Sequence, residues 1–96
     1  MMTSSRIRQL RTQAGLRQEE FAVLLGVGIA TIARWESPQG TLPTGLPRSV
    51  LDAMDRLERR GVGLENVPDI MRDRGHLAAV RWILNQAADE PAQEAR

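Results

Sequence analysis

The sequence has no cysteine and no long apolar segment, and each absence excludes a class of protein. Without cysteine, disulfide bonds, thiolate catalysis and the usual structural zinc sites are excluded. No apolar run approaches the roughly 18 residues of a membrane-spanning helix, and the start MMTSSRIRQL lacks the apolar part of a signal peptide. We therefore expect a cytoplasmic protein that contacts no membrane and holds no metal or other cofactor.

The remaining composition is that of one globular domain. The 96 residues are 42% hydrophobic, 26% charged and 3% aromatic, and the net charge is +1. The charge is uneven: residues 1–50 carry six arginines against three acidic residues, whereas residues 51–96 carry seven arginines against nine. A basic first half suits a DNA-binding module, and the mildly acidic second half suits another role.

The spacing of apolar residues predicts helices on both sides of a loop rich in proline and glycine. A first helix is predicted between a serine cap, Ser4 or Ser5, and Gly15. Its three arginines are expected to point outward: Arg6, Arg8 and Arg11. The segment 37–47 holds three prolines and two glycines, so we expect neither a helix nor a paired strand there.

The second half predicts further helices. A fourth helix over about 48–60 ends at Gly61, and its charges are interpreted as a solvated face with pairs such as Asp52–Arg56. Two more helical segments are predicted over 67–74, closed by Gly75, and over 76–90, ended by Pro91. We divide the chain into a first domain over 1–61, a C-terminal helical segment over 62–90 and a frayed tail over 91–96.

Residues 18–36, QEEFAVLLGVGIATIARWE, predict two short helices joined by a sharp turn, which is a helix-turn-helix. Gly26 can adopt a positive φ at little steric cost, so it permits the turn, and Val27 can fill the angle between the helices. Ala22 is small enough for a close crossing of the two helices. Trp35 is expected in the core, where its indole N–H needs only one partner.

From about residue 7 to residue 57 the chain resembles the phage-repressor helix-turn-helix family of the Cro and Xre types. The resemblance lies in the letters LRQEEFAVLLGV and TIARWE. The turn Gly26-Val27-Gly28 is similar to the DNA-binding half of MqsA-type antitoxins, although this cysteine-free chain has no material for their zinc-binding half. The resemblance implies an all-α fold, a lambda-repressor-like helix-turn-helix bundle with additional C-terminal helices, whose third helix enters the major groove of double-stranded DNA.

The same resemblance implies which side chains meet DNA. Candidates for base contact lie at the start of the third helix and one turn later: Gly28, Ile29, Ala30, Thr31 and Arg34. Candidates for phosphate contact flank that helix: Arg17, Gln18, Gln39 and Arg48. Arg34 can give two hydrogen bonds to guanine, and the alternative is a pair with Glu36 or a phosphate. Ile29 and Ala30 can touch thymine methyl groups or serve a protein partner, and Gln39 and Arg48 are as readily interpreted as solvated side chains.

Helix-turn-helix proteins of this type usually bind as symmetric dimers, because one recognition helix covers only a few base pairs. The candidate dimer surface is the apolar stripe of the last helix: Leu77, Val80, Trp82, Ile83 and Leu84. The alternative is that this stripe completes the core of the monomer.

Two hypotheses for function follow. The first is a sequence-specific transcriptional regulator, a dimeric autorepressor on a palindromic operator. The alternative is an antitoxin whose C-terminal segment binds and neutralises a toxin protein while the helix-turn-helix represses the operon. An enzyme is not expected, because His76 is the single histidine and the sequence shows neither a Ser/His/Asp set nor a phosphate-binding glycine loop.

Overall fold

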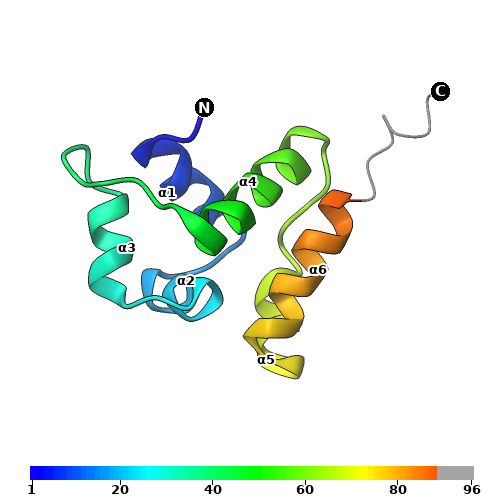
Figure 1. Ribbon diagram of the computed structural model, residues 1–96. Helices are drawn as coiled ribbons and strands as arrows, with labels where there is room; N and C mark the ends of the chain where they lie inside the picture. Colours follow the sequence, from blue (N-terminus) through cyan, green and yellow to red (C-terminus); the bar gives the residue numbers. More distant parts are fainter. Residues whose placement is uncertain (89–96) are drawn as a thin grey trace.

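Six helices make up the part of the chain that the structure describes, residues 1–88 (Figure 1). The structure is a computed structural model, and in chain order its helices are α1 (Ser4–Gln13), α2 (Gln18–Leu25), α3 (Ile29–Trp35), α4 (Gly45–Arg59), α5 (Val67–Arg74) and α6 (His76–Ala88). The predicted all-α fold is confirmed, since residues 1–88 contain no strand. The predicted helix end at Pro91 and the predicted frayed tail over 91–96 lie outside the described residues.

The cap of α1 differs from the prediction. It is Thr3 and not Ser4 or Ser5, because the Thr3 hydroxyl accepts the backbone N–H of Arg6 at 3.1 Å. The Ser4 hydroxyl instead donates to the backbone carbonyl of Ser37, 2.9 Å away. Ser4 therefore ties α1 to the segment that follows α3.

The start of α4 also differs from the prediction. The helix begins at Gly45, three residues before residue 48, so the end of the segment 37–47 is helical. Its first turn includes Pro47. Proline is tolerated there because the first N–H groups of a helix have no acceptor within the helix.

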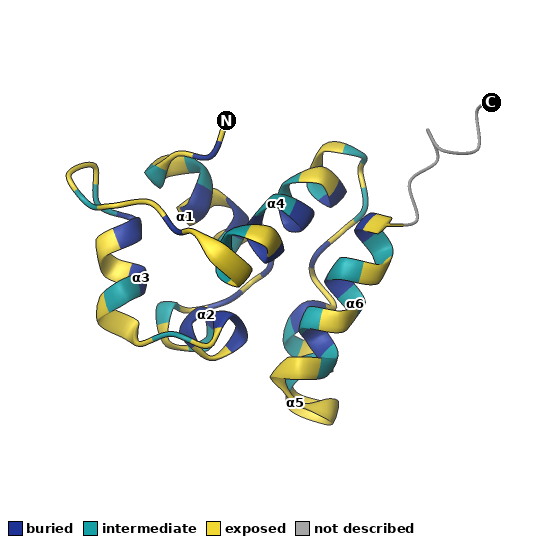
Figure 2. Ribbon diagram, viewed as in Figure 1, coloured by how far each residue is buried: buried dark blue, intermediate teal, exposed yellow. Residues whose placement is uncertain are grey.

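One apolar core holds the six helices together (Figure 2). Its fully buried side chains include Ile7 and Leu10 of α1, Phe21 of α2, Ile32 of α3, Leu51 and Leu57 of α4, Val67 of α5 and Ile83 of α6. α6 packs against α4, α5 and α2, and α1 packs against α4. The core is continuous across residue 61, so the C-terminal helices bury apolar surface of the helix-turn-helix and stabilise it.

The turn between α2 and α3 has the predicted geometry. Gly26 adopts a φ of 71°, and its N–H donates to the carbonyl of Val23 at 3.2 Å. The N–H of Val27 donates to the carbonyl of Ala22 at 3.0 Å, which completes a Schellman motif. Val27 packs against the core, and Ala22 is buried within it. The turn therefore fixes the direction in which α3 leaves α2.

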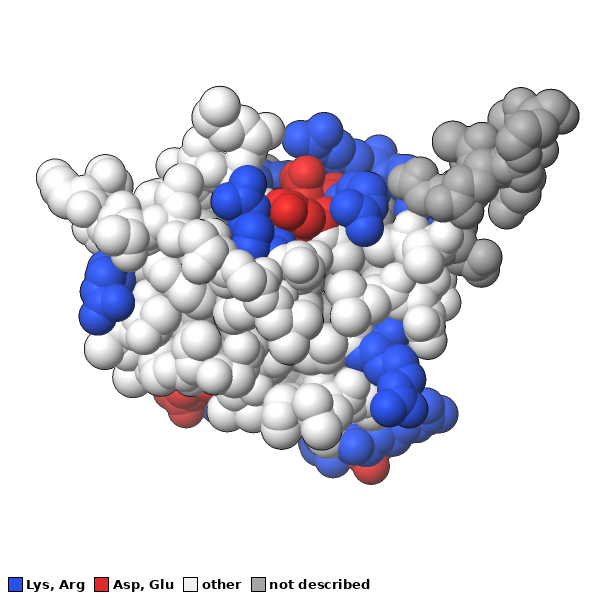
Figure 3. All heavy atoms as spheres, viewed as in Figure 1, with Lys and Arg blue, Asp and Glu red and all other residues white. Residues whose placement is uncertain are grey.

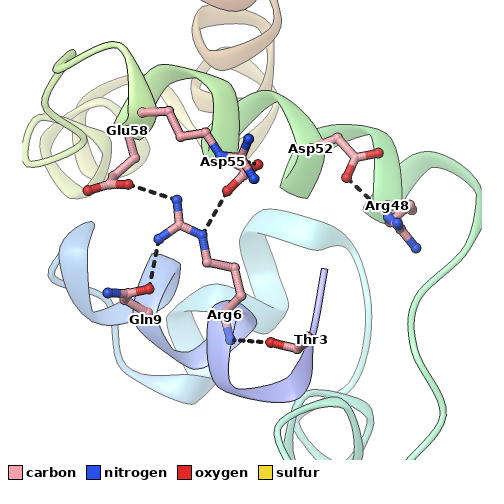
Figure 4. A network of polar contacts seen from close by, with 8 residues as sticks. Thr3, Arg6, Gln9, Arg48, Asp52, Asp55 and Glu58 are labelled. Atoms are coloured by element: carbon pink, nitrogen blue, oxygen red, sulfur yellow. Dashed lines mark hydrogen bonds and ion pairs between the residues drawn. The ribbon is translucent and has the colours of Figure 1, made fainter. Parts of the chain in front are cut away.

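The side chain of Arg6 joins α1 to α4 (Figure 4). Its Nε donates to Asp55, its Nη2 to Glu58 and its Nη1 to Gln9, each at 2.7 Å. The hydrogen bond to Glu58 raises the pKa of Arg6 above its usual value, so the guanidinium stays charged. The prediction that Arg6 points outward is therefore wrong, because two carboxylates of α4 draw it across the helix interface.

The predicted ion pair on α4 is also replaced by another. Asp52 pairs with Arg48 at 3.1 Å, where Arg56 was expected (Figure 4). Either arginine lies four residues from Asp52, so spacing alone does not choose between them. Asp55 pairs in addition with Arg59 at 3.2 Å. The Arg48–Asp52 pair is partly exposed, and such pairs contribute little to stability.

Arg60, which follows α4, contacts the end of α6. Its Nη1 and Nη2 donate to the carbonyls of Ala87 and Gln86, at 3.4 Å each. The last carbonyls of a helix lack donors within the helix and carry partial negative charge, so an arginine there is favourable. This contact fastens the end of α6 to the end of α4.

Candidate nucleic-acid interface

α3 buries one side and exposes the other (Figure 2). Ile32 and Trp35 lie in the core, as predicted for Trp35. The exposed residues of the helix are Ile29, Ala30, Ala33 and Arg34, and Thr31 is half-buried at the margin. At about 100° per residue, the four exposed positions occupy one arc of about 140° on the side away from Ile32 and Trp35. α3 therefore offers a single outer face to a partner.

Ala33 belongs to this face although the sequence analysis did not name it. It is exposed and lies beside Ile29, four residues earlier on the same side of the helix. The period that selects Ile29 thus also selects Ala33, and this signal was present in the sequence. Gly28 is the N-cap of α3, with φ −81° and ψ 159°, and has no side chain to bond the first turn.

Arg34 stands at one edge of the outer face. Across residues 1–88 its guanidinium has no hydrogen bond or ion pair. The alternative of a pair with Glu36 is excluded, because the Glu36 carboxylate is bonded to residues of α1 and α2. With no acceptor among residues 1–88, the guanidinium donors of Arg34 can bond an acceptor outside this part of the chain.

Glu36, the residue after α3, is the one buried charged residue of the described chain, with 4% of its surface exposed. Arg11 of α1 donates from Nε to its Oε2 at 2.6 Å and from Nη2 to its Oε1 at 3.1 Å. Gln18 of α2 donates from Nε2 to Oε1 at 3.1 Å. One carboxylate thus ties the end of α3 to α1 and to the start of α2, which holds α3 in its orientation.

This cluster corrects the sequence analysis at Arg11 and sharpens it at Gln18. Arg11 does not point outward, because Glu36 balances its charge and its Nη1 donates to the carbonyl of Leu16 at 3.0 Å. Gln18 is already bonded within the protein, so one of its two amide N–H groups remains for a phosphate. No structural role was predicted for Glu36, although its spacing of four residues from the buried Ile32 was a signal that it shares the inner side of the helix.

Acidic neighbours accompany the predicted phosphate contact Arg17 at the start of α2. Arg17 is 72% exposed and pairs with Glu19 at 3.7 Å and with Glu20 at 3.5 Å. Its backbone N–H donates to Oε1 of Glu20 at 2.8 Å, and this hydrogen bond lowers the pKa of the Glu20 carboxyl. The contact is half of a capping box, since an arginine side chain cannot accept the second hydrogen bond. Exposed ion pairs are weak, so Arg17 can exchange its carboxylates for a phosphate.

The other two predicted phosphate contacts follow α3 in the chain. Gln39 is exposed, and its Oε1 accepts the hydroxyl of Ser37 at 3.4 Å. Arg48 is half-buried and paired with Asp52.

In the view of Figure 3, charged side chains gather over α4 and near α5, while most of the face over α2 and α3 carries none. Because Ile29, Ala30 and Ala33 are exposed beside Arg34, the outer face of α3 is mainly apolar, with Arg34 as its cation.

A family model described as a helix-turn-helix domain matches residues 4–65, which include α1 to α4. The chain belongs to this helix-turn-helix family. Membership supports DNA binding by the helix-turn-helix protein, with α2, the turn and α3 as the motif. Comparison with curated proteins finds no match, and comparison with solved structures finds none. Among the helices of residues 1–88, none is long and apolar enough to cross a membrane.

The apolar stripe predicted for dimerisation is divided between the core and the surface of the helix-turn-helix protein. Ile83 is 0% exposed, so its side chain is not available to a second subunit. This residue belongs to the core of the monomer, which was the alternative to dimerisation. Val80, Trp82 and Leu84 are half-buried against the core. Leu77 is 69% exposed. The division arises because α2 and α4 cover one side of α6.

An apolar patch lies where α2, α4 and α6 meet. Leu46 at the start of α4 is 65% exposed, and Leu77 at the start of α6 is similarly open. Both line a cavity of about 100 Å³, together with Pro47 and Val80. Leu46, Pro47, Leu77 and Val80 are termed the α4–α6 patch below. Sequence reasoning missed Leu46 and Pro47 because it assigned them to a loop.

Proposed function

We propose that this helix-turn-helix protein is a transcriptional regulator of the Cro and Xre type, which represses its own promoter as a homodimer on a palindromic operator. The outer face of α3 carries the proposal, because it is exposed and includes Arg34, which has no partner within residues 1–88. In helix-turn-helix proteins the second helix of the motif enters the major groove. That helix is α3 in this chain.

The contacts behind α3 support this role. The Glu36 carboxylate, held by Arg11 and Gln18, fixes α3 against α1 and α2 before DNA is met. A preformed orientation lets the side chains of the outer face reach base edges without rearrangement of the fold. Arg34 then donates two hydrogen bonds to O6 and N7 of a guanine. Phosphate contacts on both sides set the register: Arg17, Gln18, Gln39 and Arg48.

Replacing Arg34 with alanine is expected to weaken binding to the operator by about 5- to 150-fold, which corresponds to about 1–3 kcal/mol. The variant loses two hydrogen bonds to guanine, whereas binding to unrelated duplexes depends on phosphate contacts and changes less. The operator is found by footprinting the protein on its own upstream region. Affinities for this duplex and for an unrelated one are then measured at one fixed salt concentration.

Arg81→Ala is the matched control, because Arg81 is an exposed arginine on α6 and not on α3. It should leave the preference for the operator unchanged. An equal loss on both duplexes in Arg34→Ala would identify Arg34 as a phosphate contact. A wild-type protein without a salt-sensitive footprint would contradict the proposed function itself.

We further propose that the homodimer forms through the α4–α6 patch. The patch has two exposed leucines and no charged side chain, a composition that suits burial against an identical patch about a twofold axis. The loop after α3 leads directly into the start of α4. Contact between two patches would thereby set the separation of the two α3 helices and of the two half-sites.

Replacing Leu46 and Leu77 together with aspartate is expected to convert the dimer to a monomer at micromolar concentration. Each interface would then bury several unpaired charges, which is strongly unfavourable. Sedimentation equilibrium measures the change. Val23→Asp is the matched control, since Val23 is 55% exposed on α2 and lies outside the patch. A double variant that remains dimeric would place the interface elsewhere, and a wild-type monomer on operator DNA would contradict the dimer.

The antitoxin alternative remains a hypothesis with one feature in its favour. A cleft of about 330 Å³ between α2 and α5 is lined by Leu16, Glu20, Val23, Pro68, Met71 and Arg72. Apolar walls with a few charged groups suit the side chains of a protein partner. The hypothesis requires a toxin gene beside the gene for this chain, so a genomic neighbourhood without one would remove it.

A further inference from the structure

We propose that α3 reads the C5 methyl groups of pyrimidines, so that the operator half-site presents thymine or 5-methylcytosine near a guanine. This inference rests on the proposed function, because it requires that α3 lie in the major groove. It adds the chemical feature that the helix recognises there.

The outer face of α3 is almost entirely alkyl. Three of its four exposed side chains consist of saturated carbon: Ile29, Ala30 and Ala33. Around the helix axis the face runs from Ile29 through Ala33 and Ala30 to Arg34, so the two alanines form its centre. Such a surface makes van der Waals contacts and offers side-chain hydrogen bonds only at the Arg34 edge.

Polar side chains near α3 do not change this picture. Thr31 is half-buried at the margin, and Gly28 has no side chain. Glu36 is buried, and the amide of Gln18 is bonded to its carboxylate. Along the centre of the face, between Ile29 and Arg34, no exposed side chain can read a base by hydrogen bonds. The group of the major groove that suits an alkyl surface is the C5 methyl of thymine, and 5-methylcytosine carries the same methyl.

Side-chain size along the face sets the geometry of the half-site. The small alanines at the centre let the backbone of α3 approach the base edges closely. Ile29 lies at the edge opposite Arg34, is 51% exposed and has a longer side chain than the alanines. Ile29 and Arg34 are five residues apart, which is about 7.5 Å along the helix axis. This length corresponds to about two base-pair steps of about 3.4 Å. The methyl-bearing pyrimidine should therefore lie about two base pairs from the guanine.

An alkyl face and a hydrogen-bonding face predict different orders of affinity for duplexes that carry different pyrimidines at the contacted position. Uracil lacks only the methyl group of thymine and keeps its O4 acceptor. 5-Methylcytosine keeps the methyl group but presents an amino donor in place of O4. α3 should therefore favour thymine and 5-methylcytosine over uracil and cytosine, whereas a helix that bonds O4 would favour thymine and uracil.

The test starts from sites that the whole chain selects from random DNA duplexes. Each selected thymine is replaced in turn by uracil opposite the same adenine, or by cytosine or 5-methylcytosine with guanine in place of that adenine. Affinity is measured by fluorescence anisotropy at fixed salt. We expect uracil to weaken binding about fourfold at each contacted position, which corresponds to about 0.8 kcal/mol for a buried carbon. 5-Methylcytosine should recover most of the affinity that cytosine loses.

Two variants locate the effect on α3. Ile29→Ala should reduce the preference for thymine over uracil at one position, because the longer side chain no longer covers the methyl group. Val23→Ala, which shortens a similarly exposed apolar residue of α2, should keep the preference. Selected sites that bind equally well with uracil would overturn the inference and leave the proposed function standing. A chain that enriches no sequence would overturn both.

Discussion

Replacing Glu36 with alanine is expected to lower the free energy of unfolding by about 3–5 kcal/mol. The carboxylate is buried and bonded to Arg11 at 2.6 and 3.1 Å and to Gln18 at 3.1 Å. Its removal leaves Arg11, whose side chain is only 15% exposed, without a counter-charge in a region of low dielectric. A loss of this size is a large share of the stability of a small domain. Urea denaturation followed by far-UV circular dichroism measures it.

Two further variants show whether the buried charge is the cause. Glu65→Ala removes an exposed glutamate and should change the free energy of unfolding by less than about 0.5 kcal/mol. Replacing Arg11 by methionine and Glu36 by leucine together should recover most of the stability, because an apolar pair of similar volume can replace a buried ion pair. If Glu36→Ala were as stable as Glu65→Ala, the ion pair would not be what holds the end of α3.

Replacing Ile83 with alanine is expected to lower the free energy of unfolding by about 2–5 kcal/mol, and replacing Leu77 by less than about 0.5 kcal/mol in the monomer. Ile83 is 0% exposed, so its truncation leaves a cavity between α6 and the helices that cover it. Leu77 is 69% exposed and already in contact with water. Denaturation at a protein concentration below that of dimerisation measures both.

The same two variants separate a core residue from an interface residue. The effect of Ile83→Ala should not depend on protein concentration, because the residue is covered by its own chain. The effect of Leu77→Ala should grow as dimers form, since Leu77 belongs to the α4–α6 patch. The opposite dependence would mean that α6 meets a second subunit through Ile83, which contradicts the fold described here.

The helix-turn-helix itself could be predicted from the sequence because its determinants are local. Gly26 adopts the left-handed conformation that ends α2. The N–H of Val27 donates to the carbonyl of Ala22 across the turn. All three lie within six residues, so their spacing in the sequence is enough to predict the conformation of the turn. The bounds of α5, residues 67 and 74, were predicted for the same reason, with Gly75 directly after its end.

The cap of α1 at Thr3 and the start of α4 at Gly45 were not predictable in this way. Thr3, Ser4 and Ser5 are all acceptable caps by residue type. The choice of Thr3 accompanies a bond from Ser4 to the carbonyl of Ser37, more than thirty residues away in the chain. The first turn of α4 contains Pro47. Proline is common both in loops and in the first turn of a helix, so the local sequence does not distinguish the two.

Residue pattern alone thus establishes that the chain is all-α, that it contains a helix-turn-helix and that α3 has one apolar inner face. Tertiary structure alone decides which charged and apolar side chains remain free for a partner. Arg11 is bonded to Glu36, whereas Arg34 has no partner within residues 1–88 and Ile83 is covered by its own chain. The physical reason is that backbone conformation depends on neighbours a few residues away, whereas charge pairing and burial act through space between helices that are distant in sequence.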